Sequence, residues 1–427
     1  MGPDVISLTR GRLHLLNLPR MSRFHSYINS AAQIIDQYAG KEPLASFLQS
    51  YFRSNKKYGS RDRKTISNLC YSFFRLGKQS ENIPVEEKLL LGLFLTSDGP
   101  DDLLEALRNE WNQLLKEATG IDSRIKYIKS GLPSFNESAL FPWKEELSEA
   151  IEIDEFRQSH LRQPDLFLRV RPGNWENVME KLQTNRSDTW FEIVNKQCIA
   201  LPNSTKLDGV IELNKEAVIQ DYSSQRIGEF LEIIKEKVHE PISVWDACAG
   251  SGGKSILAKD ILGDVDLTVS DIRESILINL KKRFNEAGIE IYKSLVVDLA
   301  SDKSNPRSGP GADLIPAKAG TKIIIVDAPC TGSGTWGRIP EQLFFFNEKK
   351  IEEYASKQKK ILNNTVTALE KGGYLLYCTC SVFRRENEEN VEWLLKSHPL
   401  QLIKMELLKG YDKKADTLFA ALFTLNN

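Results

Sequence analysis

Apolar residues change their spacing along the chain, and each spacing predicts a different kind of structure. From about Ser22 to about Phe156 they recur every three or four positions, for example over residues 65–74, which predicts amphipathic helices. The run 88–95 is apolar on nearly every side of a helix, so we expect it to be buried among the others. Residues 22–156 are therefore predicted to form an all-α helical bundle.

The next segment, residues 161–238, mixes short strand and helix patterns. Residues 165–171 have the pattern of a strand, Pro172 and Gly173 favour a turn, and a helical pattern begins at Asn174. We predict a small α+β module for this segment, so the whole chain is predicted to be a multidomain protein.

Strands and helices alternate from residue 239 to residue 427. The predicted strands are the apolar runs 242–247, 265–271, 292–297, 322–327 and 374–378. Alternation of this kind predicts a doubly wound parallel sheet, which is an α/β Rossmann-like domain. Residues 301–320 are rich in proline, glycine and serine and interrupt the pattern, and we expect them to form a mobile loop on the surface.

A glycine-rich segment follows the first predicted strand of this domain. It begins after Asp246 and consists of Cys248, Ala249, Gly250, Ser251, Gly252, Gly253 and Lys254, preceded by Ala247. Glycines let the backbone approach a ligand closely, and the N-terminus of the following helix offers N–H groups to an anion. The segment is not a phosphate-binding loop of the Walker type, because Cys248 stands where that motif has its first glycine.

Two aspartates mark the ends of the next two predicted strands, Asp271 after the second and Asp298 after the third. Either aspartate alone would more simply cap a helix. An acid after the second strand also commonly binds ribose hydroxyls, however. Together with the glycine-rich segment, the two aspartates predict a nucleoside cofactor. These residues do not distinguish a dinucleotide from S-adenosylmethionine.

Two cysteines, Cys330 and Cys380, follow the last two predicted strands, and Asp327 lies just before the first of them. The carboxyl ends of parallel strands lie at one edge of a sheet, so we expect both thiols to face one ligand. A single cysteine in such a place is more often buried and inert. The glutamates of 386–389 open a predicted helix, and we interpret them as favourable partners of the helix dipole rather than as catalytic groups.

Composition excludes several classes of protein. Six cysteines in 427 residues are too few for a disulfide framework, and we expect reduced thiols. The five histidines show no ligand spacing, so no metal site is predicted. No apolar run reaches the roughly 20 residues of a membrane span, and residues 1–4 begin no signal peptide. We predict a cytoplasmic protein, without a coiled-coil pattern that would imply an oligomer.

The net charge of −1 conceals a strong asymmetry. The first 80 residues contain 13 lysines and arginines against 4 acids, whereas the next 80 contain 8 against 17. The basic end predicts a polyanion as partner, with phosphate contacts from residues 53–64 and base stacking on Tyr51 and Tyr58. A solvated helical face would explain the same charges.

In their order, these motifs resemble the Sun (Fmu) family of RNA cytosine-C5 methyltransferases. The matching positions are Asp246–Ala249, Gly252–Lys254, Asp271, Asp298, Asp327–Cys330, Thr379–Ser381 and, just before the domain, residues 220–225. The N-terminal bundle is similar to the NusB-like domain of the bacterial 16S rRNA (RsmB-like) branch, and the middle module resembles its RNA-recognition-like subdomain. Ala249-Gly-Ser-Gly replaces the commoner Ala-Pro-Gly of the family.

The resemblance implies a role for each matching residue. Cys380 would be the nucleophile that adds to C6 of cytosine, and Cys330 would assist release of the 5-methylcytosine product. Asp327 would bind the cofactor near its methionine end and hold cytosine N3. Residues 248–254 would cradle the methionine part of S-adenosylmethionine, Asp271 its ribose and Asp298 its adenine. The substrate implied is an unpaired cytosine in RNA, first of all 16S ribosomal RNA, with transfer RNA as an alternative.

Three other functions fit the sequence less well. A DNA cytosine methyltransferase would use its first cysteine as nucleophile and would not need the Thr379-Cys-Ser element. A non-catalytic RNA-binding factor on a methyltransferase scaffold would not need Asp327, Cys330 and Cys380 intact. A dinucleotide-dependent oxidoreductase would leave the paired cysteines unexplained.

Overall fold

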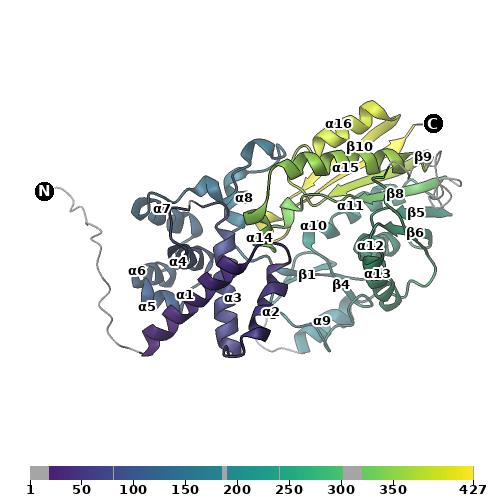
Figure 1. The fold of residues 1–427 in the computed structure, drawn as a ribbon. Helices are drawn as coiled ribbons and strands as arrows, with labels where there is room; N and C mark the ends of the chain where they lie inside the picture. Colours follow the sequence, from purple (N-terminus) through teal and green to yellow (C-terminus); the bar gives the residue numbers. More distant parts are fainter. Residues whose placement is uncertain (1–18, 80, 185–189, 240, 302–319, 427) are drawn as a thin grey trace. The chain divides into compact units, whose positions relative to one another are not determined.

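The computed structural model describes residues 19–79, 81–184, 190–239, 241–301 and 320–426 (Figure 1). The predictions for residues 1–4 and for the loop 301–320 therefore fall almost entirely outside the described residues. Contacts between α-carbons divide the chain into two compact units. The first holds residues up to 73 together with 80–135, and the second holds 74–79 together with all residues from 136 onward.

The first unit is helical, as its apolar spacing predicted. Its helices are α1 (Pro19–Gln37), α2 (Leu44–Ser54), α3 (Ser60–Arg75), α4 (Val85–Thr96), α5 (Asp102–Leu107), α6 (Asn109–Lys116) and α7 (Ile121–Gly131). All residues of α4 from Lys88 to Leu95 are buried, which confirms the prediction for that run. Helix α4 approaches α3 closely, since a Cβ atom on Gly92 would lie 2.4 Å from the carbonyl oxygen of Ser72.

Tyr58 is a core residue of this unit. It is only 7% exposed, and its hydroxyl lies 2.9 Å from Ser30 Oγ. Its ring stacks on that of Tyr51, with centroids 6.3 Å apart. The expectation that Tyr58 stacks on a nucleic-acid base is therefore wrong. The ring packs inside the helical core. The basic residues around Tyr58 gave no sign of this burial.

The second unit contains a small antiparallel sheet with the strand order β2-β3-β1-β4. Its strands are β1 (Leu166–Val170), β2 (Glu192–Ile193), β3 (Cys198–Leu201) and β4 (Ala217–Ile219), and α9 (Trp175–Thr184) follows β1. The predicted strand, turn and helix are all present in this order. Short helices η1 (Glu137–Leu140), η2 (Lys144–Glu146) and α8 (Ile153–Ser159) precede the sheet.

A buried ion cluster joins this small sheet to the large one. Arg169 on β1 and Arg171, which directly follows β1, place guanidinium nitrogens 2.6 and 2.8 Å from the carboxylate of Asp260, which lies on α12 (Gly253–Leu262). Arg169 and Asp260 are almost completely buried. Because an unpaired buried charge is costly, the three side chains fix the position of β1 against α12. The predicted domain boundaries near residues 156 and 238 stay predictions.

The large sheet has seven strands in the order β10-β11-β9-β8-β5-β6-β7. The strands are β5 (Ile242–Asp246), β6 (Val265–Asp271), β7 (Lys293–Val296), β8 (Thr321–Asp327), β9 (Leu369–Thr379), β10 (Leu400–Leu408) and β11 (Leu418–Leu425). Strands β5 to β9 are parallel, as predicted, whereas β11 runs antiparallel between β9 and β10. The sheet is therefore mixed rather than purely parallel.

Helices cover both faces of this sheet (Figure 1). Side chains of α11 (Gly228–Lys235), α12 and α13 (Glu274–Glu286) share one buried apolar cluster with Val244 of β5. Side chains of α15 (Lys349–Val366) and α16 (Glu388–Ser397) share another with Trp245, the next residue of β5. Alternate residues of one strand thus enter opposite layers. The remaining short helices are α10 (Tyr222–Gln225), η5 (Ser333–Thr335), α14 (Pro340–Phe345) and η6 (Tyr411–Lys413).

The strand order reverses between β5 and β8, since β6 and β7 lie on one side of β5 while β8 and β9 lie on the other. Open α/β sheets bind their ligands beyond the carboxyl ends of the strands at such a point. Among the described helices, none has both the length and the apolar character that crossing a membrane requires.

Candidate active site

The glycine-rich loop connects the end of β5 to the start of α12. Gly250 and Gly252 adopt left-handed backbone angles, with φ of 52° and 85°. A Cβ atom on Gly252 would lie 2.6 Å from Phe284 Cε1, so this position needs glycine for both its backbone angle and its space. The loop carries backbone N–H groups past the end of β5, where a nucleoside ligand would lie.

Asp246 ends β5 and is completely buried. Its Oδ2 accepts a hydrogen bond of 2.6 Å from Ser255 Oγ, whereas Oδ1 has no hydrogen-bond partner among the described residues. Burial raises the pKa of Asp246 to about 7, against the lowering effect of the Ser255 hydrogen bond. An orphaned carboxyl oxygen beneath the glycine-rich loop fits a ligand that brings a polar donor, such as the amino group of a methionine moiety.

Asp271 ends β6 and closes the glycine-rich loop from the side. Its Oδ2 accepts a hydrogen bond from Gly250 N at 3.1 Å, and its Oδ1 accepts one from Arg273 N at 2.9 Å. Asp298 lies two residues beyond the end of β7, is exposed, and accepts a hydrogen bond from Ala300 N at 3.0 Å. Both aspartates therefore stand after successive parallel strands, as the sequence predicted.

Lys254 and Asp327 form an ion pair across the switch point. Lys254 Nζ donates to Asp327 Oδ2 at 2.6 Å, from the first turn of α12 to the end of β8. Burial opposes the charge of this lysine, but the carboxylate of Asp327 outweighs that effect and raises the pKa of Lys254. The pair links the predicted cofactor loop to the strand that leads to Cys330.

The two cysteines converge, as the parallel-strand argument predicted. Cys330 Sγ and Cys380 Sγ lie 3.2 Å apart although 50 residues separate them in the chain. Strands β8 and β9 are adjacent, and Asp327 pairs with Cys378 near their ends. The loops that follow the two strands therefore begin side by side at the same edge of the sheet. The contact with Cys380, together with burial, raises the pKa of the Cys330 thiol.

The other cysteines have different surroundings. Cys378 is buried in the apolar cluster between the sheet and α12, and burial raises the pKa of its thiol. Cys248, in the glycine-rich loop, is partly exposed and packs against the opposite apolar layer, and burial raises the pKa of its thiol as well. All six cysteines are free thiols. The thiol pair is thus formed by Cys330 and Cys380 alone among them.

Glu386 departs from its sequence-based interpretation. Helix α16 begins at Glu388, and the Glu386 carboxylate is buried against Thr331 and Ser381 instead of facing the helix N-terminus. The helix-dipole interpretation is therefore wrong for this residue. Sequence reasoning missed it because a run of glutamates before an amphipathic helix is typical of an exposed first turn.

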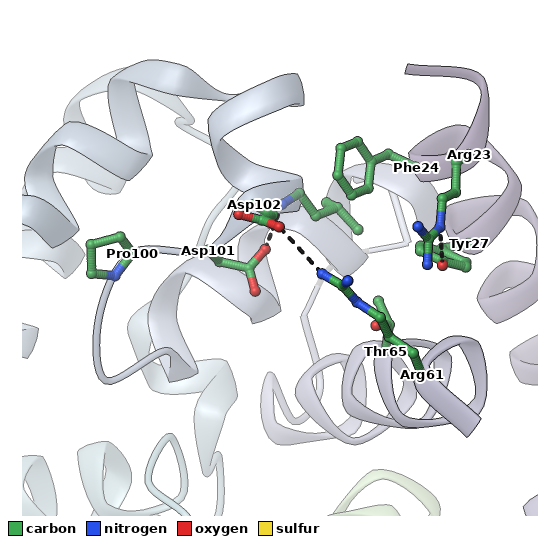
Figure 2. A pocket seen from close by; sticks show the side chains of 9 residues that line it. Arg23, Phe24, Tyr27, Arg61, Thr65, Pro100, Asp101 and Asp102 are labelled. Carbon is green, nitrogen blue, oxygen red and sulfur yellow. Dashed lines mark hydrogen bonds and ion pairs between the residues drawn. The ribbon is translucent and has the colours of Figure 1, made fainter. Parts of the chain in front are cut away.

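A separate pocket of about 610 Å³ lies within the helical unit (Figure 2). It is lined by side chains of α1, α3 and the start of α5, namely Arg23, Phe24, Tyr27, Arg61, Thr65, Pro100, Asp101, Asp102 and Leu103. Figure 2 shows Arg61 directed at Asp102, with 3.5 Å between nitrogen and oxygen. Arg23 is likewise paired, with Asp62 at 3.3 Å. None of the predicted catalytic or cofactor-binding residues lines this pocket, whereas Arg61 belongs to the basic segment 53–64 for which phosphate contacts were predicted.

The doubly wound sheet, the glycine-rich loop at its switch point and the two strand-end aspartates are the features of a Rossmann-like domain. Residues 233–420 match the family model described as 16S rRNA methyltransferase RsmB/F. The match covers nearly all of the large sheet and its helices and leaves the helical unit and the small sheet outside, so it concerns this domain rather than the whole chain.

Individual relatives are likewise RNA methyltransferases by their names. The chain is 25% identical over 289 residues to a probable ribosomal RNA small subunit methyltransferase B of Coxiella burnetii, a match covering 59% of this chain and 65% of the relative. It is 30% identical over 169 residues to the tRNA (cytosine(72)-C(5))-methyltransferase NSUN6 of Mus musculus, covering 38% and 34%. The chain thus spans less than two thirds of either relative.

A solved structure shows the same fold over almost the full length. The crystal structure of PH0851 aligns with a TM-score of 0.64 at 19% sequence identity, covering 96% of this chain and 99% of that protein. At this identity the likeness supports the arrangement of helices and strands, but it does not assign chemistry to individual residues.

Proposed function

We propose that this protein transfers a methyl group from S-adenosylmethionine to C5 of a cytosine in RNA, through a covalent bond between Cys380 and C6 of the base. The observation that carries the proposal is the 3.2 Å contact between the sulfur atoms of Cys330 and Cys380 beside the switch point of the sheet. One thiol would suffice for a simple nucleophile. Two thiols at one base fit a reaction that must first form a covalent adduct and then break it.

The residues present fit S-adenosylmethionine, which would supply an electrophilic methyl group when bound. Asp246 leaves one carboxyl oxygen without a partner among the described residues, and the loop after it turns through two left-handed glycines. We assign the methionine part to residues 248–254, the ribose to Asp271 and the adenine to Asp298. The family model that matches this domain describes methyltransferases, which favours this cofactor over a dinucleotide.

Cysteine addition solves the chemical problem of the reaction. C5 of cytosine is a weak carbon nucleophile, and addition of the Cys380 thiolate to C6 moves electron density toward C5. After methylation, the C5 proton passes to a base, the C5–C6 double bond re-forms, and the bond between C6 and the Cys380 sulfur breaks with its electrons returning to the thiolate. Cys330, held at the same base, assists this release. Asp327 holds cytosine N3, and the ammonium group of Lys254 keeps the Asp327 carboxylate oriented at 2.6 Å.

The substrate proposed is an unpaired cytosine of 16S ribosomal RNA. The family description and the Coxiella relative both name small-subunit ribosomal RNA as the substrate of those proteins. The 30% sequence identity to a tRNA cytosine-C5 methyltransferase over 169 residues makes transfer RNA the second candidate substrate. A base stacked inside a duplex cannot reach the thiol pair, which favours a cytosine in a loop or single strand as the target. The helical unit, which we propose to be NusB-like, would hold the flanking phosphates through the exposed cations of residues 53–64.

The test is methyl transfer to RNA by cysteine variants of the full chain. Cys380→Ala should abolish transfer while S-adenosylmethionine binds within about twofold of wild type. Cys330→Ala should accumulate protein covalently joined to RNA, which survives denaturing electrophoresis, because adduct formation continues and release does not.

Cys378→Ala is the matched control, because this thiol lies two residues before Cys380 but points into the apolar core. It should retain methylation. Normal turnover by Cys380→Ala would reject the proposal. Bisulfite mapping of ribosomal and transfer RNA from cells with and without the gene would then identify the cytosine.

A further inference from the structure

Glu386 lies beneath the two thiol loops and is fully buried. Its carboxylate accepts four hydrogen bonds. Oε1 accepts from Thr331 Oγ1 and from Ser381 Oγ, each at 2.6 Å. Oε2 accepts from Thr331 N and from Gln358 Nε2, each at 2.9 Å. The carboxylate therefore uses all its lone-pair directions on groups within the protein.

The donors come from three segments, and each segment is tied to a thiol. Thr331 directly follows Cys330, and Ser381 directly follows Cys380. Gln358 lies on α15, and the same Nε2 also donates to Pro329 O at 3.0 Å, immediately before Cys330. One buried carboxylate thus connects the loop after β8, the loop after β9 and the helix that covers them.

The backbone around Glu386 strengthens this connection. Glu386 O accepts a hydrogen bond of 2.5 Å from the hydroxyl of Tyr377 on β9. The neighbouring Asn387 donates to Ser381 O at 2.9 Å and accepts from Thr379 Oγ1 at 2.6 Å. The turn between β9 and α16 is therefore fixed at both ends of the Cys380 segment.

No cation pairs with Glu386 among the described residues that form ion pairs, so neutral donors alone compensate its charge. Burial raises the pKa of Glu386, while the hydrogen bonds from Ser381 and Thr331 counteract that effect. Burying a carboxylate without a cation is costly unless its donors are fixed. Fully satisfied buried networks of this kind impose one arrangement on the segments that they join.

We propose that Glu386 is a positioning residue: its carboxylate clamps the Cys330 and Cys380 loops together and so sets the separation of the two thiols. The inference rests on the proposed function for its effect on catalysis, but the effect on thiol geometry is independent of it. Misplacement of a reacting group by about 1 Å can cost about 100-fold in rate. The Glu386 carboxylate holds the residues next to both cysteines, and therefore limits the displacement of the two sulfur atoms.

Two substitutions separate hydrogen bonding from charge. In Glu386→Gln the amide oxygen can accept from Thr331 N and Gln358, while the amide nitrogen donates to the hydroxyls of Thr331 and Ser381, which rotate to accept. The clamp then persists without the charge. Glu386→Ala removes all four hydrogen bonds. Glu389→Ala is the matched control, since Glu389 belongs to the same acidic run but is 43% exposed and pairs with Arg384.

The first experiment measures thiol geometry without RNA. Phenylarsine oxide joins two nearby thiols by forming two As–S bonds, and its oxygen leaves with the two thiol protons as water. Wild type, Glu386→Gln and Glu389→Ala should each bind one arsenical, seen by intact mass. Glu386→Ala should bind it at least about tenfold more weakly. Equal binding by Glu386→Ala would overturn the clamp whatever the protein methylates, and Cys330→Ala shows the background.

The second experiment measures methyl transfer by the same variants. Glu386→Ala should lower kcat by about 100-fold, with KM for RNA and the Kd for S-adenosylmethionine within about threefold of wild type, because the loss concerns positioning. Glu386→Gln should stay within about fivefold of the wild-type kcat. A Gln variant as slow as a folded Ala variant would show that charge rather than position matters, and would overturn the inference. A wild-type chain without transferase activity would instead reject the proposed function.

Thr331→Val supplies the test if the alanine variant fails to fold. It removes one of the four donors at nearly constant volume and leaves the Thr331 N–H in place. We expect kcat of Thr331→Val to fall about tenfold at constant KM. Thr331→Ser, which keeps the hydroxyl, should have a kcat close to that of wild type. Full activity of a folded Thr331→Val, together with wild-type arsenical binding, would contradict the clamp.

Discussion

Asp246 links the cofactor loop to the pH dependence of stability. A free aspartate has a pKa near 3.9, and burial raises the pKa of Asp246 in the folded chain to about 7. Between these values the folded chain holds a proton that the unfolded chain has lost. The free energy of unfolding therefore falls as pH rises from about 4 to about 7, by about 2 to 4 kcal/mol, and levels off above.

Asp246→Asn should remove this dependence, because the amide oxygen still accepts from Ser255 but nothing titrates. Urea unfolding at pH 5 and pH 8 measures the free energy of unfolding of the variant and of wild type. From pH 5 to pH 8, the stability of the variant relative to wild type should increase. Asp264→Asn is the control, since that side chain is 97% exposed. Parallel pH profiles of wild type and Asp246→Asn would contradict the buried-carboxyl account.

The individual residues of the site were predictable to different degrees. Cys330, Cys380 and Asp327 could be found because strand ends in a parallel sheet converge, a rule that needs only the apolar runs before them. Glu386 could not be found in this way. Its burial depends on the turn that brings residues 381–387 back under both loops, and no spacing in the sequence encodes that turn.

Neighbouring glycines of the cofactor loop should respond differently to substitution. Gly252 has φ of 85°, and an added Cβ would lie 2.6 Å from Phe284 Cε1, whereas Gly253 is helical and its Cβ would meet only Arg283 Nη1 at 3.9 Å. Gly252→Ala should lower stability by about 2 kcal/mol or more. Gly253→Ala should leave stability unchanged or raise it slightly, as alanine favours the helix over glycine.

Thermal unfolding of the two variants, without ligand, is the measurement that checks this prediction. The ligand is left out because Gly253 itself belongs to the proposed cofactor loop, so a change in ligand binding would also shift the melting temperature. A Gly252→Ala variant that melts with wild type would show that Phe284 moves aside and that the left-handed turn is not required.

Strands were predicted well where helices alternate with them and poorly where they do not. The five parallel strands β5 to β9 all occur near their predicted residues. Strands β10 and β11 were not predicted. Residues 418–425 form a nearly continuous apolar run. Such a run is compatible with a buried helix and equally with a strand that is buried on both faces of its sheet. Only pairing with β9 and β10 decides between them.

The charge of the whole chain is distributed unevenly, and this asymmetry predicts how RNA binding depends on salt. Lys56 and Lys57 are exposed in the basic segment of the helical unit. Replacing both with glutamate should weaken RNA binding about tenfold at 0.1 M salt and reduce the slope of log K against log salt by about 2, because two phosphate contacts are lost. Fluorescence anisotropy with a labelled RNA loop measures both quantities.

Lys396→Glu is the comparison for this experiment. It changes a lysine of α16 in the second unit, where its side chain is 77% exposed and lies near Glu392. It should alter the affinity by less than about twofold. A double variant of Lys56 and Lys57 with unchanged affinity and slope would favour the alternative that the basic segment is only a solvated helical face.

Strand β11 is synthesised after every other strand of its sheet, yet it occupies an interior place between β10 and β9. Thr417, just before it, donates its N–H to Gly334 O, and Gly334 N donates to Cys380 O, each at 2.9 Å. A nascent polypeptide on the ribosome can thus expose both sulfur-bearing loops while the strand that anchors them is still inside the exit tunnel. We expect the two thiols to take their native positions only after β11 (Leu418–Leu425) has emerged and paired with β9 and β10.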